Sequence, residues 1–383
     1  MTAKAPPSRE YSVFDPAEVD SLIRALTSRG YEVVGPTIRD GAILYDRLSS
    51  AEDLPKGWTD EQQGGKYRLK HREDGAFFGY TVGPHTWKKF LFPSSHVLWK
   101  ARRSNGAFEI FPEEQKPTKF AFFGVRSCEL QAIQVQDKIF LEGPYADPLY
   151  KSKREKMFIV AVNCAQAGGT CFCDSMGTGP SVSTGFDLLL TEVLRDARHF
   201  LVARAGSRRG AELLAEIPAQ VASHAEIAAA ASVVDETKRH MGRSMQTDGL
   251  KELLYRNSES PRWDVVAKRC LSCANCTLVC PTCFCSTIED VTDLTGQEAS
   301  RVRKWDSCFT TDFSYLHGGS VRATVRSKYR QWMMHKLAYW LDQFATSGCV
   351  GCGRCITWCP VGIDITEEAK AIRDSDSAIS SVE

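Results

Sequence analysis

Apolar positions along the first 260 residues follow the two spacings that a mixed α/β protein needs. Val19, Leu22, Ile23 and Leu26 recur at helical spacing, which predicts a helix over residues 16–29. Short apolar runs predict strands at 31–34, 42–45, 77–82, 120–125, 157–162, 186–193 and 199–202. From residue 210 to about residue 255 the pattern is Ala-rich and indicates helices.

The last third of the chain has a different pattern. Residues 261–383 show no strand-like alternation. Within 321–344, apolar residues such as Val325, Tyr329 and Trp332 recur at helical spacing and predict a long helix. Residues 374–383 are rich in Ser and Asp, and we expect them to be frayed or dependent on a partner.

The composition is that of a globular protein and excludes several classes. Of 383 residues, 43% are hydrophobic and 25% are charged, and the net charge is +1. A chain without a basic excess is a poor candidate for a general nucleic-acid binder. No run of 18 apolar residues predicts a membrane span. The first ten residues lack the apolar segment of a secretory signal, so we expect a cytoplasmic protein.

The chain has 15 cysteines, and most of them stand in tight groups. They are absent before Cys128, and the densest groups lie at 270–285 and 349–359. In a large chain without an export signal, closely spaced cysteines favour metal ligation over disulfides.

Two copies of one cysteine motif are the most specific signal. One is Cys270-x2-Cys273-x2-Cys276-x3-Cys280-Pro281, and the other is Cys349-x2-Cys352-x2-Cys355-x3-Cys359-Pro360. This spacing is typical of bacterial [4Fe–4S] ferredoxins, in which the fourth cysteine binds the other cluster. Three cysteines at x2 spacing wrap three iron corners, and the fourth lies on a short helix that points away.

The motif therefore predicts two [4Fe–4S] clusters with crossed ligands. Cluster 1 takes Cys270, Cys273, Cys276 and Cys359, and cluster 2 takes Cys349, Cys352, Cys355 and Cys280. The alternative is a pair of zinc knuckles, although zinc sites more often use two CxxC pairs or Cys/His mixtures.

The expected fold class is α+β, with four segments. Residues 1–205 form a mixed α/β domain, and 206–260 a helical connector. Residues 261–370 form an α-helical ferredoxin-like domain with two [4Fe–4S] clusters, because the long segment between the motifs is predicted to be helical. Residues 371–383 form a flexible tail.

Four further cysteines are candidates for a third [4Fe–4S] cluster. Cys128 follows one predicted strand and Cys164 another, with Cys171 and Cys173 shortly after. If the two strands are neighbours, their carboxyl ends bring these thiols to one edge, where sites are usually built. The alternative is that these are buried thiols without a ligand, since free cysteine is a common core residue.

Other features leave their roles open. Cys283 and Cys285 follow the first motif and are expected to pack near cluster 1 without binding it, and Cys308 receives no role. The predicted helix at 321–344 carries Arg322, Arg326, Lys328, Arg330 and Lys336. These cations are candidates for docking an acidic partner, for balancing the charge of a cluster, or for a solvated helix face.

No motif for a substrate site accompanies the cysteines. The sequence holds no Gly-x-Gly-x-x-Gly after a strand, no Walker loop, no Gly-x-Ser-x-Gly and no His-Glu-x-x-His. Iron ligands without a substrate motif indicate electron transfer rather than catalysis.

Several segments together resemble a known family. They are Phe123-Gly-Val-Arg-Ser-Cys128-Glu-Leu, Asn163-Cys-x6-Cys-Phe-Cys-Asp-Ser-Met-Gly-Thr-Gly-Pro180, Cys270 to Cys285, His317-Gly-Gly with Tyr329-Arg-Gln-Trp, and Cys349 to Pro360. From about residue 15 to 370 the chain resembles the iron–sulfur β subunit of cytoplasmic group 3 [NiFe] hydrogenases of the sulfhydrogenase type. It is also similar to the A subunit of anaerobic sulfite reductase.

The resemblance implies a non-catalytic electron-transfer subunit and its partners. It relays single electrons between an FAD- and NAD(P)-binding reductase subunit and the [NiFe] hydrogenase small and large subunits. In the sulfite-reductase version, a sirohaem subunit receives the electrons. Two other classes stay open, namely an independent enzyme that uses the Cys128 group as a catalytic cluster, and a zinc-stabilised scaffold.

Overall fold

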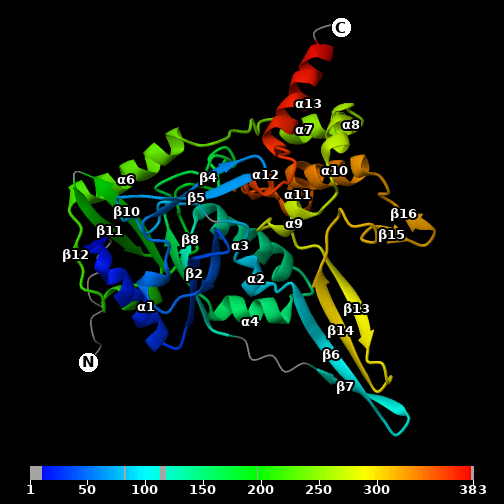
Figure 1. Cartoon of the computed structure of the whole chain (residues 1–383), viewed down its shortest axis with the longest axis horizontal. Helices are drawn as coiled ribbons and strands as arrows, with labels where there is room; N and C mark the ends of the chain where they lie inside the picture. The colour runs from blue at the N-terminus through cyan, green and yellow to red at the C-terminus, as the bar shows by residue number, and fades with distance from the viewer. Residues whose placement is uncertain (1–10, 82, 113–117, 196, 381–383) are drawn as a thin grey trace.

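A mixed central sheet organises the N-terminal part of the molecule (Figure 1). The computed structural model describes residues 11–81, 83–112, 118–195 and 197–380. Within these residues the sheet has eight strands. In spatial order they are β12 (Gln220–Val221), β1 (Ser12–Phe14), β11 (Arg198–Ala205), β10 (Leu188–Arg195), β9 (Phe158–Val162), β8 (Phe120–Val125), β2 (Glu32–Arg39) and β3 (Ala42–Arg47).

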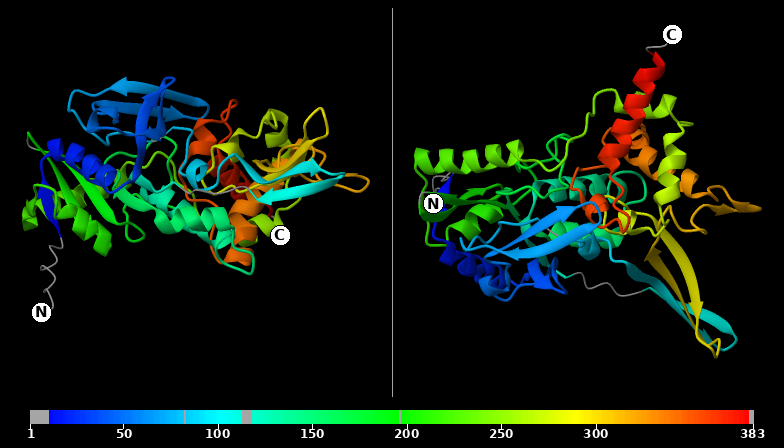
Figure 2. Two further views of the ribbon diagram at one scale, coloured as in Figure 1. Left: turned by 90° about the horizontal axis from the view of Figure 1, so that it is seen from below. Right: turned by 45° about the horizontal axis from the view of Figure 1, so that its top comes forward.

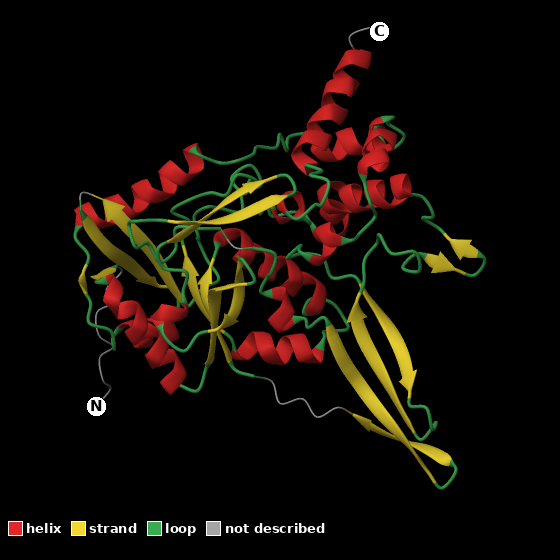
Figure 3. Cartoon of the chain, in the orientation of Figure 1, coloured by secondary structure: helices red, strands yellow, loops and turns green. Residues whose placement is uncertain are grey.

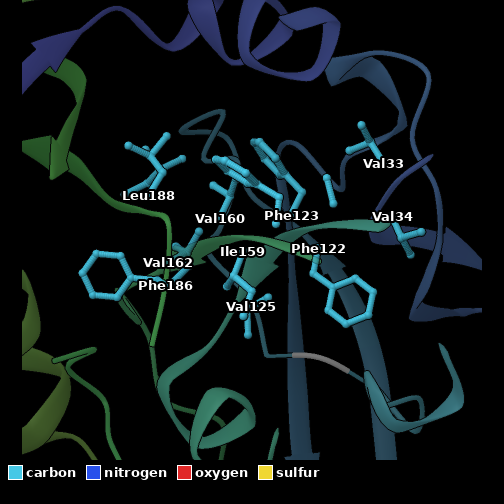
Figure 4. Close-up of a cluster of buried hydrophobic side chains, with 14 of the residues drawn as sticks. Val33, Val34, Phe122, Phe123, Val125, Ile159, Val160, Val162, Phe186 and Leu188 are labelled. Carbon is cyan, nitrogen blue, oxygen red and sulfur yellow. The ribbon is translucent and has the colours of Figure 1, made fainter. Parts of the chain in front are cut away.

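The centre of this sheet is parallel and buried on both faces. Strands β2, β8, β9 and β10 pair in parallel. Every residue of β8 and of β9 is buried, which explains why both read as continuous apolar runs. Figure 4 shows Phe122 and Phe123 of β8 and Ile159 and Val160 of β9 within this core. The carboxyl ends of β8 and β9 therefore lie next to each other.

Helices pack around the sheet. Helix α1 contacts β2, α3 contacts β9, and α5 and α6 contact β10 and β11. The helical elements of this part are η1 (Pro16–Glu18), α1 (Val19–Ser28), η2 (Ala51–Asp53), α2 (Lys88–Leu91), α3 (Ser127–Phe140), α4 (Pro148–Lys156), α5 (Arg208–Leu214) and α6 (His224–Arg239).

A second hydrophobic core belongs to the C-terminal helices. Trp263, Tyr329, Trp332, Met333 and Ile356 are buried in it. The helical elements here are α7 (Leu250–Arg256), α8 (Arg262–Arg269), α9 (Asn275–Leu278), α10 (Val325–Met334), the π-helical turn η3 (His335–Tyr339), α11 (Trp340–Phe344), α12 (Arg354–Thr357) and α13 (Ile365–Ser380). Figure 2 shows these helices grouped beside the sheet.

A four-stranded antiparallel sheet projects away from both cores (Figure 3). Its order is β13 (Ser286–Thr292), β14 (Glu298–Trp305), β6 (Ser95–Ser104) and β7 (Ala107–Pro112). We call it the β arm. Because β6 pairs with β14, the β arm joins the N-terminal part of the chain to the segment between the cysteine motifs. Two separate hairpins are β4 (Trp58–Gln63) with β5 (Lys66–His71) and β15 (Tyr315–Leu316) with β16 (Gly319–Ser320).

The predicted elements of the N-terminal part are confirmed except at one place. The helix at 16–29 and the strands at 31–34, 42–45, 120–125, 157–162, 186–193 and 199–202 correspond to η1 with α1 and to β2, β3, β8, β9, β10 and β11.

The strand predicted at 77–82 is wrong for its described residues, which form an irregular segment, and residue 82 lies outside the described residues. In this segment, side chains rather than a neighbouring strand form the hydrogen bonds of the backbone N–H and C=O groups. The Glu192 carboxylate accepts the backbone N–H groups of Phe77 (2.7 Å) and Phe78 (2.8 Å). The Arg126 guanidinium donates to the carbonyls of Phe78 and Tyr80.

The expectation of an all-helical segment after residue 260 is also wrong. Strands β13 and β14 lie there, and most of their residues are exposed or half-buried. With no buried face, their sequences carry no alternation for the pattern to reveal. The predicted helix at 321–344 is present as α10, η3 and α11 from Val325 onward. The tail expected at 371–383 is helical to Ser380 as part of α13, and 381–383 lie outside the described residues. The division into four segments stays a prediction.

Candidate iron–sulfur sites

The first motif and the end of the second motif meet at one cavity. Cys270 follows α8, Cys276 lies on α9, and Cys359 follows α12. Cys270, Cys273, Cys276 and Cys359 line the same cavity, which Cys355, assigned to cluster 2, and the rings of Phe309, Tyr329 and Trp332 also line. Burial raises the pKa of the Cys276 thiol, and the neighbouring Cys270 and Cys359 sulfurs raise it further. Coordinated iron would keep such buried thiols deprotonated. Four thiols around one cavity are the donor set that a [4Fe–4S] cluster requires.

The second motif gathers with the end of the first. Cys280 acts electrostatically on Cys349, Cys352 and Cys355. Cys280 is thus placed with the second motif although it belongs to the first, just as Cys359 lies with the first. The arrangement matches the crossed ligand sets, whose assignment to clusters stays a prediction.

Both motif loops have the same backbone conformation. Ser272 and Ala274 in the first loop have φ of 53° and 66°, and Gly351 and Gly353 in the second have φ of 62° and 73°. The turn aims the Ser272 N–H at Cys270 Sγ (3.4 Å) and the Gly351 N–H at Cys349 Sγ (3.5 Å). Each loop leads into a one-turn helix, α9 or α12, and these helices contact each other. N–H groups aimed at sulfur stabilise thiolate ligands and tune cluster potential.

The fourth cysteine of each motif, which is predicted to bind the other cluster, also has polar contacts. Cys359 Sγ accepts the Ile363 N–H at 3.3 Å. Cys280 Sγ accepts a hydrogen bond from the Lys336 ammonium at 3.1 Å and contacts the Thr282 hydroxyl at 3.1 Å. Lys336 is 5% exposed, and it lies on the π-helical turn η3. Such turns occur often at functional sites.

The third candidate group assembles at the edge of the central sheet. Cys128 lies in the first turn of α3, directly after β8, and Cys164 follows β9. Cys173 acts electrostatically on Cys128, and both Cys164 and Cys171 act on Cys173. Adjacent parallel strands thus place Cys128 and Cys164 at one edge, and the loop after β9 brings Cys171 and Cys173 to them. Their ligation of a cluster stays a prediction.

This third group packs directly on the second motif loop. The Phe172 N–H donates to the Gly351 carbonyl at 2.8 Å, and the Thr178 hydroxyl donates to the Val350 carbonyl at 2.7 Å. Cys352 is among the charges that act on Cys128 and Cys173. The three thiol groups therefore follow one another, with the second motif in the middle.

A buried ion pair crosses the boundary between the two cores. Arg354 of α12 pairs with Glu129 of α3, and both side chains are at most 5% exposed. Glu129 also accepts hydrogen bonds from Tyr45 and Trp87. Arg354 lies against the Cys352 thiol, and Glu129 adjoins Cys128. Sequence reasoning missed this pair, although each member stands next to a cysteine of a motif.

A second buried arginine serves the third group. Arg126 contacts the Cys164 thiol. Burial raises the pKa of Cys164, and the Arg126 guanidinium opposes part of that rise. A fixed cation next to buried sulfur stabilises the thiolate that iron requires.

Of the remaining cysteines, Cys285 and Cys308 contact each other, and the Cys283 thiol contacts Cys280. Cys283, Cys285 and Cys308 lie where β13 begins and just after β14 ends. A hydrogen bond from the Cys308 thiol lowers the pKa of Cys285 to about 7. Cys283 contacts Cys280, which lies with the second motif, and the packing of Cys283 and Cys285 near cluster 1 stays a prediction. The structure gives Cys308 a partner, Cys285, that the sequence did not reveal.

The charged helix at 321–344 has several local roles. Arg326 and Arg330 both pair with Glu259 of this chain. Lys336 faces thiol sulfur instead of solvent. Among the candidate roles of this helix, the position of Lys336 fits charge balance at a cluster.

The described residues contain neither a single-ion metal site nor a membrane-spanning helix. Across the described ranges, no set of three or more His, Cys, Asp or Glu side chains is arranged to hold a metal ion. A four-iron cluster differs from one ion because each thiolate binds its own iron atom. Of the helices in the described residues, none has both the length and the apolar character that a membrane crossing requires.

Comparison with known proteins identifies the family. Residues 269–363 match the model of the 4Fe-4S dicluster domain, a segment that contains both cysteine motifs. The chain is 32% identical to sulfhydrogenase 2 subunit beta of Pyrococcus furiosus over 345 residues, which cover 89% of this chain and 92% of that protein. The chain belongs to the sulfhydrogenase beta-subunit family. No solved structure matches it.

Membership of this family confirms the resemblance drawn from the sequence. The match to the dicluster model supports [4Fe–4S] clusters, and the relative is by name a subunit of a hydrogenase. The sulfhydrogenase beta-subunit family thus accounts for an iron–sulfur chain with an electron-transfer role in a larger complex.

Proposed function

We propose that the chain relays single electrons between a flavin- and NAD(P)-binding reductase subunit and a [NiFe] hydrogenase module. The observation that carries the proposal is the row of three thiol groups, in which the loop at Cys349–Cys355 adjoins both of the others. Each bound [4Fe–4S] cluster supplies one-electron chemistry.

In this proposal, cysteines of the chain hold three clusters in a row, and buried cations tune the reduction potentials of those clusters. Cys270, Cys273, Cys276 and Cys359 hold one cluster, and Cys349, Cys352, Cys355 and Cys280 hold the next. Cys128, Cys164, Cys171 and Cys173 hold a third at the sheet edge. Lys336, Arg354 and Arg126 place a buried cation against sulfur at the second or third site. These cations favour the reduced, more negative state.

The test starts with the complex as it exists. A tag on this chain retrieves its partners under anaerobic conditions, and metals are counted on the same sample. A flavin subunit with a nickel-containing partner supports the proposal. A flavin subunit with sirohaem and without nickel would transfer the relay to sulfite reduction.

A single variant then tests the relay itself. Cys276→Ala should remove or convert one cluster and interrupt electron flow through the complex, while flavin reduction with an artificial acceptor survives. Cys285→Ala is the matched control, because it removes a nearby thiol that lies outside the predicted ligand sets and contacts Cys308. Unchanged physiological electron flow in Cys276→Ala would contradict the relay.

A further inference from the structure

Cys285 and Cys308 lie together because of the β arm. Ser286 pairs with Trp305 at the end of the β13–β14 ladder. One residue beyond that pair, the Asp306 N–H donates to the Cys285 carbonyl at 2.9 Å. The chain then turns, and both the thiol and the backbone N–H of Cys308 contact Cys285 Sγ. Both cysteines are free thiols in the structure.

Two buried lysines lie near this pair. Lys88 and Lys336 are at most 5% exposed, and both act on the Cys285 sulfur. In the part of the chain that the structure describes, neither ammonium forms an ion pair with Asp or Glu. Lys88 instead donates to the Cys283 carbonyl at 3.1 Å and lies over the Trp305 ring. A buried cation needs an anionic neighbour, and thiolates are the anions at hand.

Solvent reaches the pair, and the first candidate cluster site lies next to it. Cys285 and Cys308 are half-buried, not enclosed. Phe309, which follows Cys308, lines the cavity of Cys270, Cys273 and Cys276. Its carbonyl accepts the Ser272 hydroxyl of the motif loop at 3.3 Å. Cys308 is therefore connected to the first site by its peptide bond to Phe309 and by one hydrogen bond.

We propose that Cys285 and Cys308 form a reversible disulfide by exchange with small-molecule disulfides, and that this modification acts on the first cysteine site through Phe309. The Cys285 thiolate attacks one sulfur of the small disulfide and releases one small thiolate. Cys308 then attacks the Cys285 sulfur of the mixed disulfide and releases the second. The two protons of the cysteines leave with the two small thiols, so two cysteines are oxidised and one small disulfide is reduced.

The test uses the anaerobically purified complex and glutathione disulfide as the probe. After exposure, free thiols are alkylated in denaturant and the peptides are analysed by mass spectrometry. We expect a cross-link between the peptides of Cys285 and Cys308 that excess dithiothreitol reverses. It should be retained in Cys283→Ser, the matched control, and lost in Cys285→Ser and Cys308→Ser.

A second readout tests the coupling to the first site. In the wild-type complex, formation of the cross-link should shift the reduction potential or the EPR spectrum of the first cluster, and in Cys308→Ser glutathione disulfide should leave both unchanged. Persistent glutathione adducts without a cross-link, or a disulfide between other cysteines, would overturn the proposed Cys285–Cys308 disulfide. A complete cross-link with an unchanged cluster signal would overturn the coupling.

The coupling rests on the proposed function, but the cross-link does not. Iron is counted on the same sample. A preparation without iron would contradict the proposed relay and the coupling, and the cross-link seen by mass spectrometry would still support the dithiol pair.

Discussion

Buried lysine next to sulfur is the feature that most directly links single residues to redox behaviour. Lys336 donates to Cys280 Sγ and Thr282 Oγ1 from within the second core. Burial alone would lower the pKa of Lys336. The sulfurs around it outweigh that effect and hold its pKa above the usual value, so Lys336 keeps its positive charge. A retained positive charge at this distance stabilises the extra electron of a reduced cluster.

Replacing this lysine should make the second cluster harder to reduce. Lys336→Met keeps an unbranched side chain of nearly the same length and removes the charge and the hydrogen bond. We expect the potential to fall by on the order of 60 mV, which corresponds to about a tenfold change for one electron. EPR-monitored redox titration measures it. Lys70→Met, at an exposed ion pair with Glu61, is the control and should change nothing. Equal potentials in both variants would count against the role of Lys336.

The histidine before this lysine should make stability depend on pH. Burial lowers the pKa of His335 to about 4. In the unfolded chain its pKa is about 6.5, so the unfolded state takes up the proton first as the pH falls. Stability from this residue is complete above about pH 6.5 and declines towards pH 4, by at most about 1.4 kcal/mol per pH unit.

His335→Gln removes this contribution. The drop in thermal midpoint between pH 7 and pH 5 should become smaller than in the wild-type protein. The drop should not vanish, because burial also lowers the pKa of His85 to about 4. Identical pH dependence in the variant and the wild-type protein would show that His335 titrates normally in the folded state.

At the scale of elements, the two motif loops have the same backbone conformation but pack against different parts of the chain. A Cβ on Gly353 would lie 2.3 Å from the Thr170 carbonyl oxygen, and one on Gly351 would lie 2.7 Å from the backbone of Cys173. The equivalent positions of the first loop hold Ser272 and Ala274, which carry side chains at the same positive φ. The second loop needs glycine because the third cysteine group is packed on it.

This difference predicts opposite effects of matched substitutions. Gly353→Ala should cost about 1–2 kcal/mol for the left-handed backbone alone. The clash with Thr170 adds to that cost and should lower the iron content of the second and third sites. Ala274→Gly should be neutral or slightly stabilising, since it relieves the same backbone strain. Iron per chain and the thermal midpoint are the measurements, and a harmless Gly353→Ala would contradict the packing described above.

At the scale of the whole molecule, two hydrophobic cores meet at a polar seam. The Arg354–Glu129 pair lies in it, and the Thr357 hydroxyl donates to the Gln62 side chain at 2.8 Å. Thr170 contacts the Thr357 hydroxyl at 2.7 Å. A buried seam of this kind tolerates paired groups and penalises a lone one. It should make the two cores unfold together.

Breaking the Arg354–Glu129 pair should therefore allow the two cores to unfold separately. Glu129→Gln leaves the Arg354 charge without its partner and should cost about 3–5 kcal/mol. Adding Arg354→Met should restore part of that loss, because the unpaired charge is then gone. Denaturant unfolding followed by Trp fluorescence and by cluster absorbance measures both the cost and whether the transitions coincide. Additive effects of the two substitutions would argue against their coupling.

How much the sequence predicts also depends on scale. Motif spacing predicted the residues that gather around Cys270 and Cys349, and apolar runs predicted the buried strands β8 and β9. These signals are local in sequence. The pairing of Glu129 with Arg354 and of Cys285 with Cys308 joins residues far apart, and no pattern within a window reports it. The β arm was missed because its strands bury too little to alternate.

The β arm also has a consequence during synthesis, because the two strands that pair at its centre, β6 and β14, are made at different times. Strand β6 leaves the ribosome roughly 200 residues before β14, which at about 5–20 residues per second is a delay of about 10 to 40 s. During that time one edge of the β6–β7 hairpin has no neighbour, and an unpaired edge invites the wrong strand. Arg102, which later pairs with Glu298, and Arg103 place positive charge on that edge. Arg102, which pairs with Glu298 in the finished β arm, is thus suited to keep nascent chains apart before Glu298 has been made.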